Sequence, residues 1–411
     1  MLTKIHEIQD KKVLKTIGYY AFILALFMEA LIVLADKSAL MNPFEGRLFQ
    51  LTFILCCVKV LFTKYDLKEY IFLALFCVLG LAVDYFGDRN EILRFVILVA
   101  ACKDVDIRKI LKMLLWIYIF GCTILALLSV FGVYGPLTVP KEYQGIGFID
   151  RYCFGMGNAN SFHTMFFVIV LLALYLYYKQ LKWWGYLVLA LANGMLYMLT
   201  DSRTSTAMVF LSIIAFGLIK FKDGTLLKNK CIATVFTYAC LFINAAMVGL
   251  SIWFAAGARR YNKYYWDSFW EDPPNPPRAM IFFDKLLTGR ILSLTEYDFH
   301  GAIESWRWFT VPDHTVYFDL GFVRLFYWYG IIPATILLLV FAILIVYLIR
   351  KEKYTEVLLL TFVSIYTLVE AHFVSVYIGR CYPLLILGMY APKIVADIKI
   401  SKKGIKASNE Q

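Results

Sequence analysis

Three arginines of this chain stand beside other polar residues, two of them at the ends of long apolar segments and the third, Arg290, in a long polar stretch. They are Arg203 in "DSRT", Arg290 in "LTGR" and Arg324 in "DLGFVR". A guanidinium group keeps its charge and can bind two phosphate oxygens through parallel hydrogen bonds. Because a charge at membrane depth is costly, such residues often mark a functional site. We therefore expect these arginines to bind an anionic group.

Two further residues could transfer a proton. His314 and Asp319 precede the apolar segment that contains Arg324. An imidazole or a carboxylate can act as a general base. The structural alternatives are a capping or surface role for His314 and an ion pair between Asp319 and Arg324. Asp201 is expected to cap the helix that Arg203 begins.

Three more polar residues complete the candidate site. Asn160 begins an apolar segment, Arg278 lies in a long polar stretch, and Glu370 lies near the end of another apolar segment. We expect them to contact substrate. The alternative for an arginine in such a place is solvation, or extension toward lipid headgroups.

Familiar cofactor motifs are absent from the sequence. It contains no P-loop, no G-x-G-x-x-G and no Ser-His-Asp spacing of a known hydrolase. Most of the nine cysteines lie in apolar runs, and no Cys/His group has metal-ligand spacing. We expect no cofactor, no metal and no ATP-driven transport.

The elements that must position these residues are membrane helices. The chain is 61% hydrophobic and 17% charged, whereas soluble domains average about 45–50% apolar and 25% charged residues. Apolar stretches of bilayer length recur throughout. The prediction is an all-α, polytopic membrane protein with about twelve spans. These are residues 17–35, 47–63, 69–86, 91–102, 111–131, 158–178, 183–200, 203–219, 231–254, 325–349, 357–376 and 381–396.

The positions of lysine and arginine predict the orientation. Alternate short loops are basic, as at Lys64 and Lys68 and at Lys179 and Lys182, and the loops between them carry few basic residues. Basic loops face the cytoplasm. We therefore expect a multi-pass plasma-membrane protein with both termini cytoplasmic and with Arg203 on the outer side. The net charge of +11 follows this orientation and does not indicate a nucleic-acid partner.

One long segment, 255–315, is predicted to be an extracytoplasmic loop within a single membrane domain, 1–411. It contains "YNKYYWDSFWEDPPNPPR". Long loops in compact proteins are usually functional or disordered, and this aromatic content argues against disorder. A folded cap whose rings stack on sugars is the expected role.

Four short segments carry a resemblance to a known family. "KLLTGRILSL" (285–294), followed by "FDLGFVRLFYWYGIIPATILLL" (318–339), resembles the Wzy-type oligosaccharide repeat-unit polymerases. "DSRT" (201–204) and "GNANSFHT" (157–164) are similar to segments shared across the O-antigen polymerase and ligase superfamily. The chain departs from the family pattern at Asp284, where asparagine is common, and at Phe322, where tyrosine is common.

The resemblance implies a metal-independent glycosyltransferase acting on undecaprenyl-pyrophosphate-linked oligosaccharides at the outer leaflet. Arg203, Arg290 and Arg324 would bind the pyrophosphate, and His314 or Asp319 would take the acceptor proton. Implied roles for other residues are orientation of one substrate by Asn160 and substrate contacts by Arg278 and Glu370. The implied partners are membrane lipid and the flippase and chain-length regulator of the same pathway.

Three alternatives stay open. A ligase of the same superfamily would use the same donor and a different acceptor. A flippase or other transporter of lipid-linked oligosaccharides would also have about twelve spans, but inverted repeats and charges within the helices are typical of transporters. A structural partner in the export machinery is the third alternative.

Overall fold

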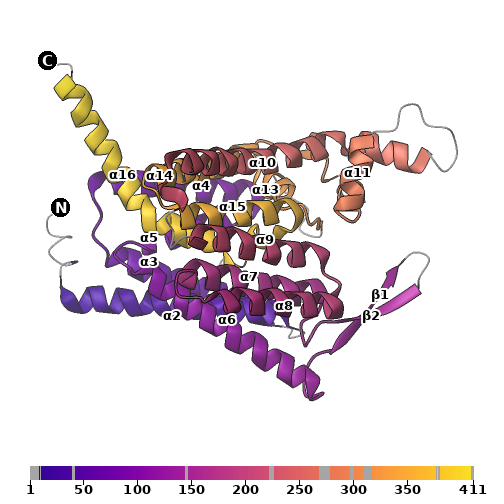
Figure 1. Cartoon of the computed structure of the whole chain (residues 1–411). Helices are drawn as coiled ribbons and strands as arrows, with labels where there is room; N and C mark the ends of the chain where they lie inside the picture. Colours follow the sequence, from indigo (N-terminus) through magenta and orange to yellow (C-terminus); the bar gives the residue numbers. More distant parts are fainter. Residues whose placement is uncertain are drawn as a thin grey trace. The chain divides into compact units, whose positions relative to one another are not determined.

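A computed structural model of the chain shows a mostly helical fold made of two compact units. Unit 1 comprises Met1–Lys64 and Ala101–Thr237, and unit 2 comprises Tyr65–Ala100 and Tyr238–Gln411. Figure 1 labels their helices and strands. The described residues are 9, 11–38, 42–143, 147–221, 226–267, 278–296, 300–309, 316–375, 377 and 380–408.

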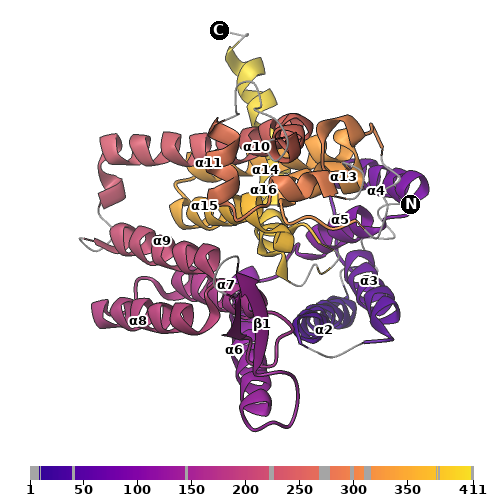
Figure 2. The same ribbon diagram turned by 90° about the vertical axis from the view of Figure 1, so that its right-hand side faces the viewer.

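Unit 1 is built around α7, which packs against α6, α8 and α9. α2 packs against both α3 and α6, and Figure 2 shows α2 beside α3 and α8 beside α9. Most of α7 is buried, as expected for a helix that is apolar on all sides. The helices of unit 1 are α2 (Lys12–Lys37), α3 (Glu45–Leu61), α6 (Ile107–Val130), α7 (Ala159–Tyr177), α8 (Trp183–Thr200), α9 (Arg203–Lys220) and the 3-10 helix η2 (Leu226–Lys228).

Polar side chains buried within unit 1 are paired across its helices. Thr52 of α3 donates to Glu29 of α2 at 2.6 Å. His163 of α7 contacts Thr200 at 2.7 Å and Asn193 at 3.0 Å, both on α8. Because unpaired polar groups are costly in an apolar interior, these contacts fix how the helices face one another.

A β-hairpin interrupts unit 1 between α6 and α7, so the prediction of an all-α fold is wrong in this segment. β1 (Thr138–Tyr143) pairs antiparallel with β2 (Gly147–Tyr152), with Thr138 opposite Tyr152. Pro140 within β1 is tolerated because a two-stranded ribbon leaves one side of each strand unpaired. The strands are short and do not alternate clearly in hydrophobicity, which explains why the sequence did not predict them.

Unit 2 contains the segments that carry most of the candidate site. α13, α15 and the 3-10 helix η5 contact one another, and α14 packs against α13, α15 and α16. α10 begins in unit 1 and continues into unit 2. The elements are α4 (Leu67–Gly87), α5 (Glu91–Ala101), α10 (Lys230–Asp267), α11 (Arg278–Leu286), η3 (Leu292–Thr295), η4 (Ile303–Ser305), α13 (Gly321–Tyr329), α14 (Ile331–Arg350), α15 (Tyr354–Val369), η5 (Ala371–Phe373) and α16 (Tyr382–Ser408).

The predicted loop 255–315 is partly helical. α10 continues to Asp267, so the first residues of that segment extend the preceding helix. α11, η3 and η4 also lie within it. The helical periodicity here was masked by the aromatic and charged composition, which resembles that of an exposed loop.

Seven helices are long and apolar enough to cross a membrane, counted over the described residues. Each coincides with a predicted span: they are α2, α4, α6, α7, α9, α10 and α14. The other five predicted spans correspond to α3, α5, α8, α15 and α16, of which α3, α5 and α15 have only 17, 11 and 16 residues.

The predicted span 325–349 is wrong as one continuous helix, because it breaks at Gly330. This residue has φ 91°, and a Cβ atom there would lie 2.6 Å from the carbonyl oxygen of Trp308. Only glycine adopts this conformation and allows this approach without strain. α13 is therefore a separate helix of nine residues, all of them buried.

Candidate functional site

A tight turn after α11 directs the side chain of Arg290. Thr288 and Gly289 both have positive φ, 56° and 84°. Space around Gly289 is open, so its backbone conformation is the reason for glycine at this position. Arg290 Nη1 donates to Thr288 Oγ1 at 2.8 Å and to the carbonyl oxygen of Leu287 at 3.1 Å. The guanidinium group is thus held against its own turn.

Asp284 fixes this turn from within. Its Oδ1 accepts hydrogen bonds from the backbone amides of Ile291, at 2.7 Å, and Leu292, at 3.1 Å. Its Oδ2 accepts from the hydroxyl of Tyr261 on α10 at 3.0 Å. An ionised carboxylate can accept all three bonds, whereas an asparagine has one acceptor oxygen. Asp284, one of the departures from the family pattern, therefore has a clear structural role.

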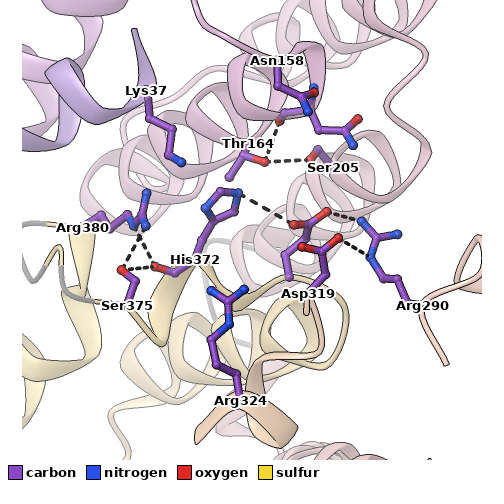
Figure 3. A network of polar contacts seen from close by, with 12 residues as sticks. Lys37, Asn158, Thr164, Ser205, Arg290, Asp319, Arg324, His372, Ser375 and Arg380 are labelled. Atoms are coloured by element: carbon purple, nitrogen blue, oxygen red, sulfur yellow. Dashed lines mark hydrogen bonds and ion pairs between the residues drawn. The ribbon is translucent and has the colours of Figure 1, made fainter. Parts of the chain in front are cut away.

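Arg290 forms ion pairs with two carboxylates. Its Nη2 donates to Glu370 Oε1, and its Nε lies 3.3 Å from Asp319 Oδ2. Figure 3 shows Arg290 directed at Asp319. The side chains of Arg290 and Glu370 are only 11% and 12% exposed, whereas that of Asp319 is 56% exposed. The buried pair is therefore accessible from the side of Asp319.

The segment after α15 carries Glu370, and Arg380 donates hydrogen bonds to residues of this segment. Glu370 is extended and immediately precedes η5, and its Oε2 lies 3.9 Å from His372 Nε2. Arg380 Nε donates to the carbonyl oxygen of His372 at 2.7 Å, and its Nη2 donates to Ser375 Oγ at 2.9 Å. Arg380 therefore closes the short loop that begins at Glu370 (Figure 3).

Arg324 reaches the same region from α13. Its Nε donates to the carbonyl oxygen of Phe318 at 3.0 Å, and its guanidinium carbon lies 4.8 Å from the ring centre of Tyr317 and 4.9 Å from that of Trp328. Burial lowers the pKa of Arg324 to about 10, against the opposing effect of Asp319. The group is therefore cationic at neutral pH.

A close approach of two helices brings Arg324 near Glu370. A Cβ atom on Gly321, the first residue of α13, would lie 2.7 Å from the carbonyl oxygen of Thr367 on α15. Any larger residue would separate the two helices. Glycine at position 321 is thus required for the packing on which the site depends.

These residues form one group, which we name the arginine–carboxylate cluster: Arg290, Asp319, Arg324, Glu370, His372 and Arg380. The cluster contains three guanidinium groups and two carboxylates, so it carries one excess positive charge when His372 is neutral. Arg290 already contacts both carboxylates. The two Nη atoms of Arg324 make no hydrogen bond to any other residue that the structure describes. Arg324 is therefore the cation best placed to bind an added anion.

Two predicted site residues, Asn160 and Arg203, belong to unit 1. Asn160 Oδ1 accepts a hydrogen bond from Arg151 Nη2 at 2.7 Å. Arg151, on β2, also donates to the carbonyl oxygens of Thr200 at 2.6 Å and Asp201 at 3.2 Å. It thereby binds the last carbonyls of α8, which have no partner within the helix.

Arg203 follows this turn and is exposed. Its side chain is 70% exposed, and its Nε lies 4.0 Å from Asp201 Oδ1. The prediction that Asp201 caps the helix of Arg203 is wrong: Asp201 ends α8 in the left-handed conformation, with φ 45°, and Ser202 precedes α9. In the same unit, Thr164 Oγ1 lies 3.4 Å from Ser205 Oγ (Figure 3).

The structure thus brings four predicted residues together in unit 2: Arg290, Arg324, Asp319 and Glu370. Arg278 begins α11 and is exposed, and no described contact joins it to the cluster. His314 lies outside the described residues. Asp319, for which an ion pair with Arg324 was the structural alternative, pairs with Arg290 instead.

Two buried arginines, Arg151 and Arg380, were not among the predicted site residues. Each is among the few basic residues of the short loops predicted to face outside. Their rarity there was the available signal, because a basic residue retained in such a loop needs a specific reason. That reason is a set of carbonyl and hydroxyl hydrogen-bond partners, which only the folded structure shows.

Chemically, the cluster can bind an anion and accept a proton. Arg324 offers two charge-assisted donors, and the half-exposed Asp319 is an acceptor held in place by Arg290. Among the described residues, no three His, Cys, Asp or Glu side chains are grouped so as to hold a metal ion. No model of a known protein family, no curated protein and no solved structure matches the chain.

Proposed function

We propose that this protein joins oligosaccharide repeat units, carried on undecaprenyl pyrophosphate, into capsular or exopolysaccharide at the outer leaflet of the plasma membrane. One observation carries the proposal. Segments 285–294, 318–339 and 370–372 are far apart in sequence, yet Arg290, Asp319 and Glu370 from them meet in one group of ion pairs. The first two of these segments carry the resemblance to the repeat-unit polymerases.

The reaction would proceed by displacement of the lipid carrier. The bond between the anomeric carbon of the growing glycan and the pyrophosphate oxygen breaks, and the electron pair leaves on that oxygen. The hydroxyl oxygen of the acceptor unit bonds to the same carbon and releases its proton to a base. No oxidant or nucleotide is needed, so the protein must stabilise the leaving anion and accept the proton.

Arg324 is the best-supported residue for the leaving group. Its charge is buried, and its Nη atoms, which have no hydrogen-bond partner among the described residues, can donate to pyrophosphate oxygens. A preorganised cation in a site of low dielectric stabilises developing negative charge without reorganisation. Arg203 of unit 1 is exposed, and it remains a proposed phosphate contact on the sequence resemblance alone.

Arg290 is better supported as the residue that positions Asp319 and Glu370. Its guanidinium is already engaged by both carboxylates, so an added phosphate would have to displace one of them. Asp319, which is the more exposed of the two, is the proposed proton acceptor. His314 remains an alternative base, and Asn160, Arg278 and Glu370 remain proposed substrate contacts.

The full topology belongs to the same proposal. Twelve spans, cytoplasmic termini and an outer cap within 255–315 would put the cluster at the outer surface. The flippase and the chain-length regulator of the pathway would be its functional neighbours.

The proposal is tested with purified protein in liposomes and a lipid-pyrophosphate-linked repeat unit, with products separated on a gel. A ladder of multiples is expected from the wild type, none from Arg324→Ala, and a normal ladder from Arg260→Ala, an exposed arginine of α10. A single transfer to an unrelated acceptor would indicate a ligase. Movement of the substrate across the bilayer without new bonds would indicate a flippase and contradict the proposal.

A further inference from the structure

Three charged residues lie buried at the start of α5, where the sequence analysis predicted no site. Arg89, Glu91 and Arg94 expose 6%, 5% and 6% of their surface. Arg89 Nη1 lies 3.3 Å from Glu91 Oε1. Buried charges persist when they are paired, and Glu91 is one partner of Arg89. A second partner of Arg89 is an aromatic ring.

That partner is Trp328 of α13. The guanidinium carbon of Arg89 lies 3.8 Å from the centre of the Trp328 ring, and the ring is only 3% exposed. Tryptophan is the strongest cation–π partner among the side chains, and the interaction gains strength when both groups are removed from water. The contact fixes the orientation of the indole.

The same indole contacts Arg324. The Arg324 guanidinium carbon lies 4.9 Å from the Trp328 ring centre, and positions 324 and 328 share one face of α13 because they are four residues apart. Tyr317 contacts Arg324 at 4.8 Å and also meets Trp328 edge-on. Among the described residues, the guanidinium is therefore placed by two rings and one carbonyl group, and none of these contacts is a hydrogen bond from its Nη atoms.

We infer that Arg89 is a positioning residue for Arg324 and acts through Trp328. This inference rests on the proposed function, because it assigns Arg89 to the same pyrophosphate site. Arg89 holds the indole, and the indole limits the orientations that the Arg324 guanidinium can adopt. A lysine at position 89 would keep the charge but could not stack as a plane on the ring.

Chemical labelling of Arg324 tests the inference without any enzymatic activity. Intact protein in detergent is treated with phenylglyoxal, which modifies guanidinium groups, and the adduct at Arg324 is measured by mass spectrometry. We expect Trp328→Leu to increase the labelling rate of Arg324 about tenfold, because it removes one cation–π contact to Arg324, and Arg89→Lys to increase it similarly, because the indole that makes this contact is held less firmly. Trp328→Phe, which retains a weaker ring, should give an intermediate rate.

Arg94→Lys is the matched control. It makes the same substitution at the other buried arginine of this group, which is equally buried. Its effect on Arg324 labelling should be small. Equal acceleration in Arg94→Lys and Arg89→Lys would indicate general loosening of the fold, and no acceleration in Arg89→Lys would mean that the two arginines are uncoupled. Either result overturns the inference.

Kinetics provide the second readout. Arg89→Lys should raise KM for the lipid-linked donor about tenfold with little change in the amount of folded protein, and it should have no further effect in a Trp328→Leu background. A purely structural role would lower folded yield and leave KM unchanged. If the wild type forms no polymer, the proposed function fails, while the labelling experiment still tests the coupling of Arg89 to Arg324.

Discussion

Arg290 and Glu370 are 80 positions apart in the chain, and their side chains meet in a buried ion pair. Arg290 comes from a turn after α11, and Glu370 follows the last residue of α15. Leaving either charge buried without its partner would be costly. The pair therefore joins the two segments and sets the position of Asp319, the second carboxylate on Arg290.

The first prediction concerns this pair. Arg290→Ala should lower the free energy of unfolding by about 3–5 kcal/mol, because it leaves Glu370 buried without its guanidinium partner. The double variant Arg290→Met/Glu370→Leu should lose much less, because neither charge remains. Thermal unfolding of the purified variants provides the comparison. If the stability loss of the double variant equals the sum of the losses in Arg290→Met and Glu370→Leu, the two side chains are not coupled.

Asp284 should control the turn that carries Arg290. Asp284→Ala removes three hydrogen bonds to a buried carboxylate and should cost about 3 kcal/mol. Asp284→Asn should cost less, because its amide oxygen can still accept from the backbone. Tyr261→Phe removes one of the three bonds and serves as the control for stability. Polymer formation should decrease in the order of the stability losses, which a gel assay would reveal.

Gly321 should be intolerant of a side chain. Gly321→Ala would place a Cβ atom 2.7 Å from the carbonyl oxygen of Thr367, so α13 would have to move away from α15. We expect a loss of about 1–3 kcal/mol and a strong decrease in polymer formation. Gly249→Ala on α10 is the matched control, because no atom lies within 4 Å of the added Cβ. Its stability should be unchanged or slightly increased.

The charge of Arg324 predicts a pH dependence. Its pKa is lowered to about 10 by burial, so the folded state binds fewer protons than the unfolded chain above that pH. Burying the charge therefore lowers the free energy of unfolding by a constant amount near neutral pH, and this loss becomes smaller as the pH rises through about 10. Donor affinity should fall over the same range, because the anion loses its cation.

Arg324→Lys sharpens this prediction. The ordinary pKa of lysine is about two units below that of arginine, and burial lowers it further. The variant should lose donor affinity at a pH about two units lower than the wild type. The measurement is KM for the donor as a function of pH. Identical profiles for both proteins would exclude Arg324 as the titrating group.

Cys231 offers a test of orientation. It is the one exposed cysteine of the nine, and it lies at the start of α10 directly after Lys228 and Lys230, which are predicted to be cytoplasmic. A membrane-impermeant maleimide should label it in inverted membrane vesicles and not in intact cells. Cys231→Ser controls for labelling at the eight other cysteines. Labelling in intact cells would contradict the proposed topology and indicate the opposite orientation.

The sequence by itself determined the local properties of this protein. Seven predicted spans coincide with long apolar helices, because membrane hydropathy is summed over neighbouring residues. Asn158 accepts a hydrogen bond from the backbone amide of Asn160 at the start of α7, within the segment that the sequence marked as a helix start. Arg324 could be chosen because a costly charge stands out beside an apolar segment, whereas Arg290 was chosen from the motif in segment 285–294.

Only the tertiary structure decided which of these charges meet. Asp319 is five positions from Arg324, yet its ion pair is with Arg290, because the turn fixed by Asp284 carries Arg290 to it. The division of 325–349 at Gly330 and the contact of Arg89 with Trp328 likewise depend on segments distant in sequence. Partner choice among buried charges follows from helix packing and turn geometry, and no local pattern of residues encodes either one.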